Sequence, residues 1–324
     1  MAALNGVIIA VVIAGLVAGC SKSDMNAIAQ PATPAVSRVL IVVLENQDYH
    51  AVVGNSVFKR LAASGVLFTN SHGRIHPSYC NYIALVAGQV PKTMLPACEL
   101  DRPKIVDVPT IADRLAEKGK TWRNYAERYP GNCSLDDALP NRKAPKYVRR
   151  HVPFLSFKRI VESPTACANV VKAEQLEVDR ANGKLPDFAF YSPDMCNSGH
   201  GSAACTFGQG EREKGLEAAA AWIDTFVATL RNDTESWRGT LLIITFDESD
   251  PRTDQSRLKK NAKTATIGLN HIYTVFLGDM VRSGDTLEGW VGHFDVLRTI
   301  GYVLGLEPVG PEDTERKPIT TIWK

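Results

Sequence analysis

The sequence lacks a strong bias of charge. Its 324 residues include 37 Lys and Arg against 35 Asp and Glu, which gives a formal net charge of +2. Because proteins that bind nucleic acid usually carry a clustered basic excess, this balance does not suggest a nucleic-acid partner. We also find no internal repeat and no second domain boundary. With 44% hydrophobic residues, the chain can bury one large core.

A hydrophobic run long enough to span a membrane is missing from the N-terminal region. The run from Val7 to Val17 is too short for a span and is typical of an export signal. The following LVAGC (16–20) resembles the lipobox of bacterial lipoproteins, in which Cys20 would be lipidated and become the mature N-terminus. No Lys or Arg precedes it, so the usual basic n-region is absent, and an ordinary cleaved signal remains the alternative. Ser21 after the cysteine would favour the outer membrane, which predicts a periplasmic or envelope location.

Paired CxxC motifs are absent as well. Apart from Cys20, six cysteines remain, an even number in a chain predicted to be exported. Three disulfides are therefore expected, although six cysteines allow fifteen pairings. Cys196 and Cys205 are close enough to close one loop. Zinc binding by these cysteines is the weaker alternative.

The sequence after residue 20 predicts a flexible tether followed by one domain. Residues 21–37 are small and polar with two prolines, which is typical of a flexible linker. From residue 38 to residue 324, strand and helix patterns alternate. This alternation predicts a three-layer α/β/α sandwich around a mostly parallel sheet. The expected strands are 38–44, 66–70, 121–125, 186–191, 240–246 and 271–277, and the expected helices are 56–63, about 78–87, 108–118, 211–230 and 294–304.

Oxygen-bearing side chains and a histidine follow three of these strands. Ligands of open parallel sheets bind at the carboxyl ends of the strands, so these side chains are expected to meet at one edge. Each could instead belong to a turn or a solvated acidic loop, but their recurrence favours a divalent-metal site. They are Glu45 and Asn46, Asp247 and Glu248, and Asp194 with the later His200.

The stretch HPSYCNYIAL (76–85) leaves two roles open for Ser78. A serine before a helical apolar run often caps the helix. A serine at a helix N-terminus can also be a nucleophile, because the backbone amides there favour an anion.

Eight segments in order resemble the bacterial phosphoesterase family of the alkaline-phosphatase superfamily, which contains acid phosphatases and phospholipases C. The resemblance spans about residues 38–308 and implies an alkaline-phosphatase-like fold. The segments are VVLENQDYHAVVG (42–54), HPSYCNYIALVAG (76–88), WRNYAERYPGNC (122–133), KYVRRHVPF (146–154), PDMCNSGH (193–200), LLIITFDESD (241–250), NHIYTVFLGDMVRSG (270–284) and GHFDVLRTIGYVLGL (292–306).

The resemblance implies a role for each matching residue. Ser78 would be the nucleophile, and Asn81 would contact the substrate. Cys80 replaces a proline usual in the family, which suggests a tether at the start of the helix. One divalent cation (Ca, Mg, Mn or Zn) would be held by Glu45, Asn46, Ser78, Asp247 and Glu248.

Histidines complete the implied site. His151 and His200 would contact phosphate or protonate the leaving alcohol, and His271 and His293 would be second-tier substrate-binding residues. Relatives often read Asn-Asp-x-His-Asp around His200, whereas residues 197–201 here lack both acids. This departure favours a single metal.

A basic stretch surrounds His151. Between residues 142 and 160 there are seven Lys and Arg and no acid. Such a run is usually a solvated surface, but part of its charge could draw anionic substrates toward the site.

Together these features predict an exported, metal-dependent phosphomonoesterase of the acid phosphatase type that works through a phosphoserine intermediate. Its substrate would be a small phosphate ester, with a phospholipid as a further option, and Cys20 would anchor it to the membrane. One alternative is a phosphodiesterase or phospholipase C with the same site. Another is a catalytically silent, anion-binding envelope lipoprotein. Sulfatase chemistry is disfavoured because the CxPxR or SxPxR motif is absent at 78–82.

Overall fold

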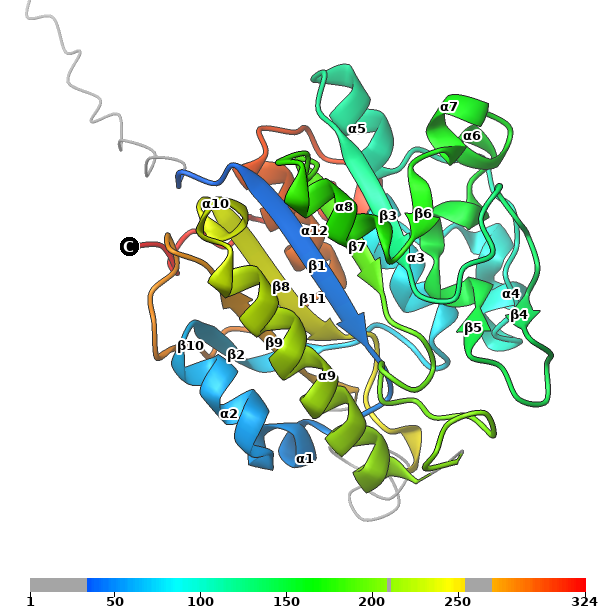
Figure 1. Ribbon diagram of the computed structural model, residues 1–324. Helices are drawn as coiled ribbons and strands as arrows, with labels where there is room; N and C mark the ends of the chain where they lie inside the picture. The colour runs from blue at the N-terminus through cyan, green and yellow to red at the C-terminus, as the bar shows by residue number, and fades with distance from the viewer. Residues whose placement is uncertain (1–33, 209–210, 254–269) are drawn as a thin grey trace, which may run out of the picture. The chain divides into compact units, whose positions relative to one another are not determined.

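A mostly parallel sheet forms the centre of the protein. The computed structural model describes residues 34–208, 211–253 and 270–324 (Figure 1). Only β9 runs antiparallel to its neighbours in the path across the described sheet. In order the strands are β10 (Asp285–Leu287), β2 (Val66–His72), β9 (His271–Leu277), β8 (Thr240–Phe246), β1 (Arg38–Leu44), β7 (Phe188–Ser192), β3 (Trp122–Ala126) and β6 (Val170–Lys172), with β11 (Val291–Gly292) beside β2 and a separate hairpin of β4 (Ala138–Leu139) and β5 (Tyr147–Val148).

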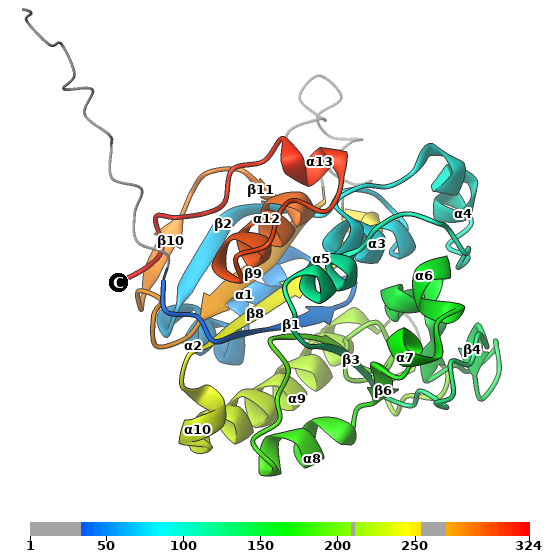
Figure 2. The same ribbon diagram turned by 90° about the horizontal axis from the view of Figure 1, so that it is seen from above.

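Helices cover both faces of the sheet (Figure 2). The longer helices on one face are α3 (Tyr79–Ala87), α5 (Ile111–Glu117) and α12 (His293–Val303), and those on the other are α1 (Tyr49–Gly54), α2 (Ser56–Ala63), α8 (Gln175–Ala181) and α9 (Arg212–Asn232). Shorter helices are α4 (Leu95–Glu99), α6 (Lys158–Val161), α7 (Pro164–Cys167), α10 (Thr234–Trp237) and α13 (Pro311–Thr314). The predicted three-layer α/β/α architecture is thus confirmed.

The core consists of two apolar clusters, one on each face of the sheet. Strand β1 shows how they arise, because successive side chains of a strand point to opposite faces. Val39, Ile41 and Val43 belong to the cluster under α3, α5 and α12. Leu40 and Val42 belong to the cluster under α2 and α9. A strand covered on both sides needs apolar residues at every position, which explains the unbroken RVLIVVL sequence.

Local signals set where several elements begin and end. The helix predicted from residue 108 begins at Ile111, because Thr110 is extended and its hydroxyl accepts the backbone N–H of Ala112. Strand β2 continues beyond the predicted residue 70 to His72, where it also pairs with β11. Helix α3 ends at Gly88, which adopts a left-handed conformation with φ of 59°.

The six remaining cysteines form the three expected disulfides. The pairs are Cys80–Cys98, Cys133–Cys167 and Cys196–Cys205, so the guessed loop between the last two is confirmed. The alternative of zinc binding by these cysteines is wrong. The pair Cys80–Cys98 joins α3 to α4, which gives the predicted tether at the start of α3.

The predicted signal and the lipidated Cys20 lie outside the described residues, as does most of the predicted 21–37 tether. At its described end, Ser37 already donates a backbone hydrogen bond to Gly239. Within the ranges that the structure describes, no helix has the length and apolar character needed to cross a membrane.

Candidate active site

The register between β1 and β8 brings together side chains that are two hundred residues apart in sequence. Leu44 pairs with Phe246 at the carboxyl end of the two parallel strands. The next residues, Glu45 and Asp247, therefore stand side by side. The backbone N–H of Asp247 donates to the carbonyl of Leu44 at 3.0 Å, and that of Asn46 donates to Asp247 Oδ1 at 3.3 Å.

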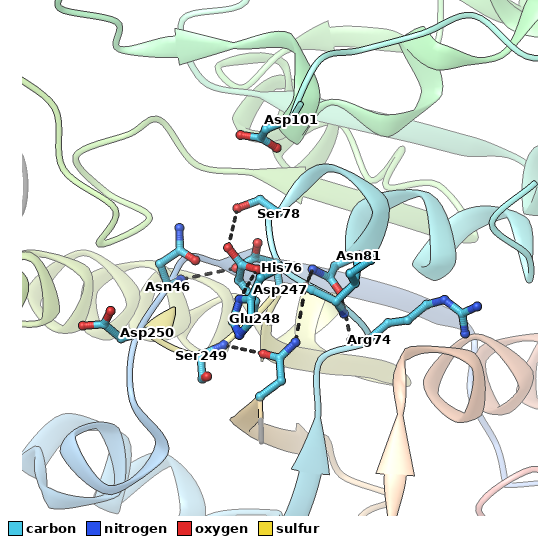
Figure 3. A network of polar contacts seen from close by, with 12 residues as sticks. Asn46, Arg74, His76, Ser78, Asn81, Asp101, Asp247, Glu248, Ser249 and Asp250 are labelled. Atoms are coloured by element: carbon cyan, nitrogen blue, oxygen red, sulfur yellow. Dashed lines mark hydrogen bonds and ion pairs between the residues drawn. The ribbon is translucent and has the colours of Figure 1, made fainter. Parts of the chain in front are cut away.

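Ser78 is buried at the start of α3, and its hydroxyl does not cap that helix. The Ser78 backbone is itself helical, and within the described chain its side chain makes no capping hydrogen bond. Instead, Ser78 Oγ lies within hydrogen-bond distance of two carboxyl groups, 3.1 Å from Glu45 Oε2 and 3.1 Å from Glu248 Oε1. Figure 3 shows Ser78 beside Glu248 and Asp247. The helix end is occupied by Asp101, whose Oδ1 accepts the backbone N–H of Tyr79 at 3.0 Å. The capping role that the sequence left open for Ser78 is therefore excluded.

Three buried carboxyl groups surround the serine. Burial raises the pKa of Glu45 to about 8, although the hydrogen bond from Tyr82 acts in the opposite direction. Burial, together with the charges of the other two acids, raises the pKa of Asp247 well above its usual range. Burial also raises the pKa of Glu248, which its contact with His76 partly offsets. Like charges packed away from water favour protonation or a bound cation.

The site fits the predicted divalent metal by its donor set. Among the described residues, the buried oxygens Asn46 Oδ1 and Asp247 Oδ2 have no hydrogen-bond partner. Buried polar atoms are rarely left unpaired, and these are hard oxygen donors of the type that Mg²⁺, Ca²⁺ and Mn²⁺ prefer. No three His, Cys, Asp or Glu side chains in the described ranges form a ready-made metal geometry. Metal binding here therefore stays a prediction.

His151 and His200 lie beside this cluster. The His151 ring stacks on Tyr82, and its Nε2 lies 3.0 Å from Glu45 Oε1, although it is not aligned for a hydrogen bond. Burial and the nearby Arg150 lower the pKa of His151 well below its usual range. The centroids of the two histidine rings are 6.4 Å apart. Burial lowers the pKa of His200 to about 4.

The other three predicted substrate-binding residues have different surroundings. Asn81 bonds to backbone at both ends of its amide, donating to Ile75 O at 2.7 Å and accepting from Arg74 N at 2.8 Å. It thus holds the loop that leads to Ser78. His293 Nε2 lies 2.7 Å from the carbonyl oxygen of Asp247. His271 stacks on Tyr49, and its Nε2 lies 3.0 Å from Thr69 O.

Sequence reasoning missed three residues that contact the site. Tyr82 donates from its hydroxyl to Glu45 Oε1 at 2.5 Å, and His76 Nδ1 lies 2.6 Å from Glu248 Oε2. Asp101 caps α3 and lies 2.7 Å from Arg150 Nε. The position of Tyr82, one helical turn after Ser78, was a signal that could have found it. Asp101 lies in a separate segment, and nothing in its local sequence marks it.

Sequence comparisons identify the family to which the chain belongs. The Phosphoesterase family model matches residues 55–307, so the chain belongs to that family. The chain is 28% identical over 291 residues to a protein of Kluyveromyces lactis named probable acid phosphatase, covering 86% of this chain and 61% of the relative. It is 30% identical over 300 residues to the phosphatidylinositol-3-phosphatase of Mycobacterium tuberculosis, covering 91% and 86%. The chain spans about 60% of the length of the fungal relatives it matches.

Solved structures confirm the alkaline-phosphatase-like fold. One is a protein of the alkaline phosphatase superfamily from Vibrio parahaemolyticus, with a TM-score of 0.60 and 14% identity over 90% of this chain and 75% of the other. Another is a phosphonate monoester hydrolase from Silicibacter pomeroyi, with a TM-score of 0.53 and 13% identity over 87% and 76%. At this identity the likeness concerns the fold alone.

Proposed function

We propose that the chain is a metal-dependent phosphomonoesterase of the acid phosphatase type, with Ser78 as its nucleophile. The observation that carries this proposal is the Ser78 hydroxyl, which does not cap the helix and lies within hydrogen-bond distance of two buried carboxyl groups. A neutral serine is a poor nucleophile and needs such a partner to take its proton. The names of the relatives, acid phosphatase and phosphatidylinositol-3-phosphatase, support a phosphate monoester as substrate.

The reaction would proceed in two displacements. Ser78 Oγ attacks phosphorus and gives its proton to Glu45 or Glu248, which would be ionised when a cation is bound. The bond from phosphorus to the ester oxygen breaks, and the alcohol leaves with a proton. Water then attacks the phosphoserine, the P–Oγ bond breaks, Ser78 regains a proton and inorganic phosphate departs. His200 can donate a proton to the leaving alcohol only in acid, because its pKa is about 4.

A bound divalent cation would be held by Glu45, Asn46, Ser78, Asp247 and Glu248. It would supply the positive charge that stabilises the serine alkoxide and polarises a phosphoryl oxygen. Tyr82 and His151 would keep Glu45 oriented through their contacts with Oε1. His293 would do the same for the backbone of Asp247.

Hydrolysis of three nitrophenyl esters tests the function. The esters are p-nitrophenyl phosphate, bis-p-nitrophenyl phosphate and p-nitrophenylphosphorylcholine, assayed with and without EDTA and with Ser78→Ala. We expect metal-dependent turnover of the monoester that disappears in the variant. Preference for a diester would move the assignment to a phosphodiesterase or phospholipase C. If none of the three esters is hydrolysed with any metal or at any pH, the remaining alternative is a catalytically silent, anion-binding lipoprotein.

We further propose that the protein is exported and anchored through Cys20. Three disulfides support an oxidising compartment. Fractionation of cells that express the chain tests this, with Cys20→Ala as the comparison. Release of the variant from the membrane fraction is the expected result, and equal retention of both forms would contradict the anchor.

A further inference from the structure

A basic cavity lies next to the nucleophile. Its volume is about 300 Å³, and it reaches the site through three lining residues, Asp101, Arg150 and His200. Asp101 contacts Tyr79, the residue after Ser78. Figure 3 shows Ser78 between Asp101 on one side and Asp247 and Glu248 on the other. Glu45, Asp247 and Glu248 are not among the residues that line the cavity, so it is separate from the carboxylate cluster.

The cavity has an excess of positive charge. Four cationic side chains line it, Arg102, Arg142, Lys143 and Arg150, against two carboxylates. Both carboxylates are already engaged. Asp101 lies 2.7 Å from Arg150, and Asp137 pairs with Arg142 and, at 3.4 Å, with Arg149.

The remaining charge is available to a ligand. Arg102 and Lys143 have no ion pair within the described ranges. The Nε of Arg150 forms an ion pair with Asp101 but is not aligned with it for a hydrogen bond. Arg212 also lies near His200, and its Nε forms a 3.7 Å ion pair with Asp250, while its buried Nη1 has no hydrogen-bond partner in the described chain. Guanidinium groups whose hydrogen-bond donors are only partly used, together with the unpaired Arg102 and Lys143, are suited to binding phosphate oxygens.

We propose that this cavity binds the leaving group of the substrate, and that this leaving group carries a second phosphate. The inference rests on the proposed phosphatase function. In-line displacement places the leaving oxygen opposite the attacking Ser78 Oγ, and the carboxylates close the other side of the serine. The volume is at the lower end of ligand pockets, which suits a phosphorylated polyol and not acyl chains. A second cavity of about 770 Å³ lies elsewhere, around Cys133 and Cys167, and includes none of the site residues.

A series of inositol phosphates tests this subsite. Initial phosphate release gives kcat/KM for myo-inositol 3-phosphate, inositol 1,3-bisphosphate and dioctanoyl phosphatidylinositol 3-phosphate, which share the 3-phosphate. We expect at least a tenfold preference for the compounds with two phosphate groups over the monophosphate, and this preference should weaken with added salt. Equal preference for the soluble and the lipid compound identifies the headgroup as sufficient, and preference for the lipid alone identifies a lipid source. No preference for either overturns the proposal.

Variants of the basic stretch test whether the residues that line the cavity cause the preference for a second phosphate. Arg142→Gln with Lys143→Gln should reduce the preference about fivefold, and the exposed Lys143→Gln alone should reduce it in the same direction. The matched control is Lys158→Gln with Arg159→Gln, because both side chains are exposed and Arg159 pairs with Asp107 outside the cavity. This control should keep the wild-type preference. A preference that survives the Arg142 and Lys143 variants contradicts the assigned subsite.

Calorimetric titration of Ser78→Ala with the two soluble inositol phosphates separates this inference from the proposed function. Tighter binding of the bisphosphate without any wild-type turnover supports the subsite and rejects the phosphatase. Ser78-dependent turnover of p-nitrophenyl phosphate with equal binding of both inositol phosphates supports the phosphatase and rejects the subsite.

Discussion

Two buried carboxylates, Asp179 and Asp247, have opposite surroundings. Asp179 in α8 accepts hydrogen bonds from Arg123, from the Tyr125 hydroxyl at 2.6 Å and from Gln175 at 2.9 Å. Burial alone would raise its pKa, but these donors outweigh burial and the pKa is lowered. The folded protein thus supplies this buried carboxylate with both hydrogen-bond donors and a neutralising positive charge.

Asp247 has two acids where Asp179 has an arginine. Glu45 and Glu248 add negative charge beside it, and its Oδ2 has no partner among the described residues. Asp179 is therefore a charge that stabilises the fold, whereas the clustered charges around Asp247 destabilise it in the absence of a cation. Unsatisfied, like-charged groups of the second kind are typical of functional sites.

The largest effect is expected at Ser78. Ser78→Ala should reduce kcat for p-nitrophenyl phosphate at least ~10³-fold, because the nucleophile is lost. Its melting temperature should stay near that of the wild type, since the hydroxyl caps no helix.

Ser163 gives the matched control. Its Oγ accepts the backbone N–H of Ala166 at the start of α7. Ser163→Ala should therefore lower the free energy of unfolding by about 1 kcal/mol and leave kcat unchanged. A Ser78→Ala protein that is destabilised but active would contradict the assignment.

Replacing each of the two aspartates by asparagine tests the difference between them directly. Asp247→Asn should lower kcat at least ~100-fold, since it removes a proposed metal ligand. Without added metal it should not lower stability, because it removes a charge from an acidic cluster. Asp179→Asn should lower the free energy of unfolding by about 3 kcal/mol by leaving Arg123 without its partner, and keep activity near wild type. Kinetics and urea unfolding measure the two effects, and equal profiles for both variants would refute the distinction.

A divalent cation should stabilise one of these carboxylate sites and not the other. At a concentration 100 times its dissociation constant, a cation that binds the native state alone adds about 2.7 kcal/mol, a shift of roughly 5 °C in the melting temperature. EDTA should reverse the shift. Asp247→Asn should lose the shift and Asp179→Asn should retain it, as measured by thermal unfolding with Mg²⁺, Ca²⁺, Mn²⁺ or Zn²⁺. The same shift in both variants would place the cation elsewhere.

The smallest effect concerns pH. Because the pKa of Asp179 is lowered in the folded state, its contribution to stability is complete above the unfolded pKa of about 3.9 and is lost as pH falls through the folded value. The difference in unfolding free energy between wild type and Asp179→Asn should therefore be constant from about pH 8 to pH 5 and shrink in stronger acid. A difference that grows in acid would contradict the lowered pKa.

Sequence patterns predicted the elements that depend on local or periodic signals. The unbroken apolar runs of β1 and β8 marked them as central strands, and their ends located Glu45 and Asp247. The six cysteines of the described domain predicted disulfides, and short spacing suggested one pair correctly.

The contacts around these residues depend on tertiary placement and could not be read from the sequence. The cap of α3 comes from Asp101, which the Cys80–Cys98 disulfide helps to hold nearby. The basic stretch gave no sign of which cations would meet, since Arg150 contacts Asp101 and Arg159 contacts Asp107. Such partners are fixed by the packing of separate segments, for which the chain carries no periodic signal.

The pairing of β1 with β8 has a consequence for which changes of length this chain can accept. Leu44 stands opposite Phe246, and the register runs without a break from Arg38. Inserting one residue in either strand would displace the following residue by about 3.3 Å and turn its side chain to the other face of the sheet. Variation by insertion and deletion should therefore be confined to the connecting segments, and the two central strands should keep a fixed length wherever Glu45 and Asp247 work together.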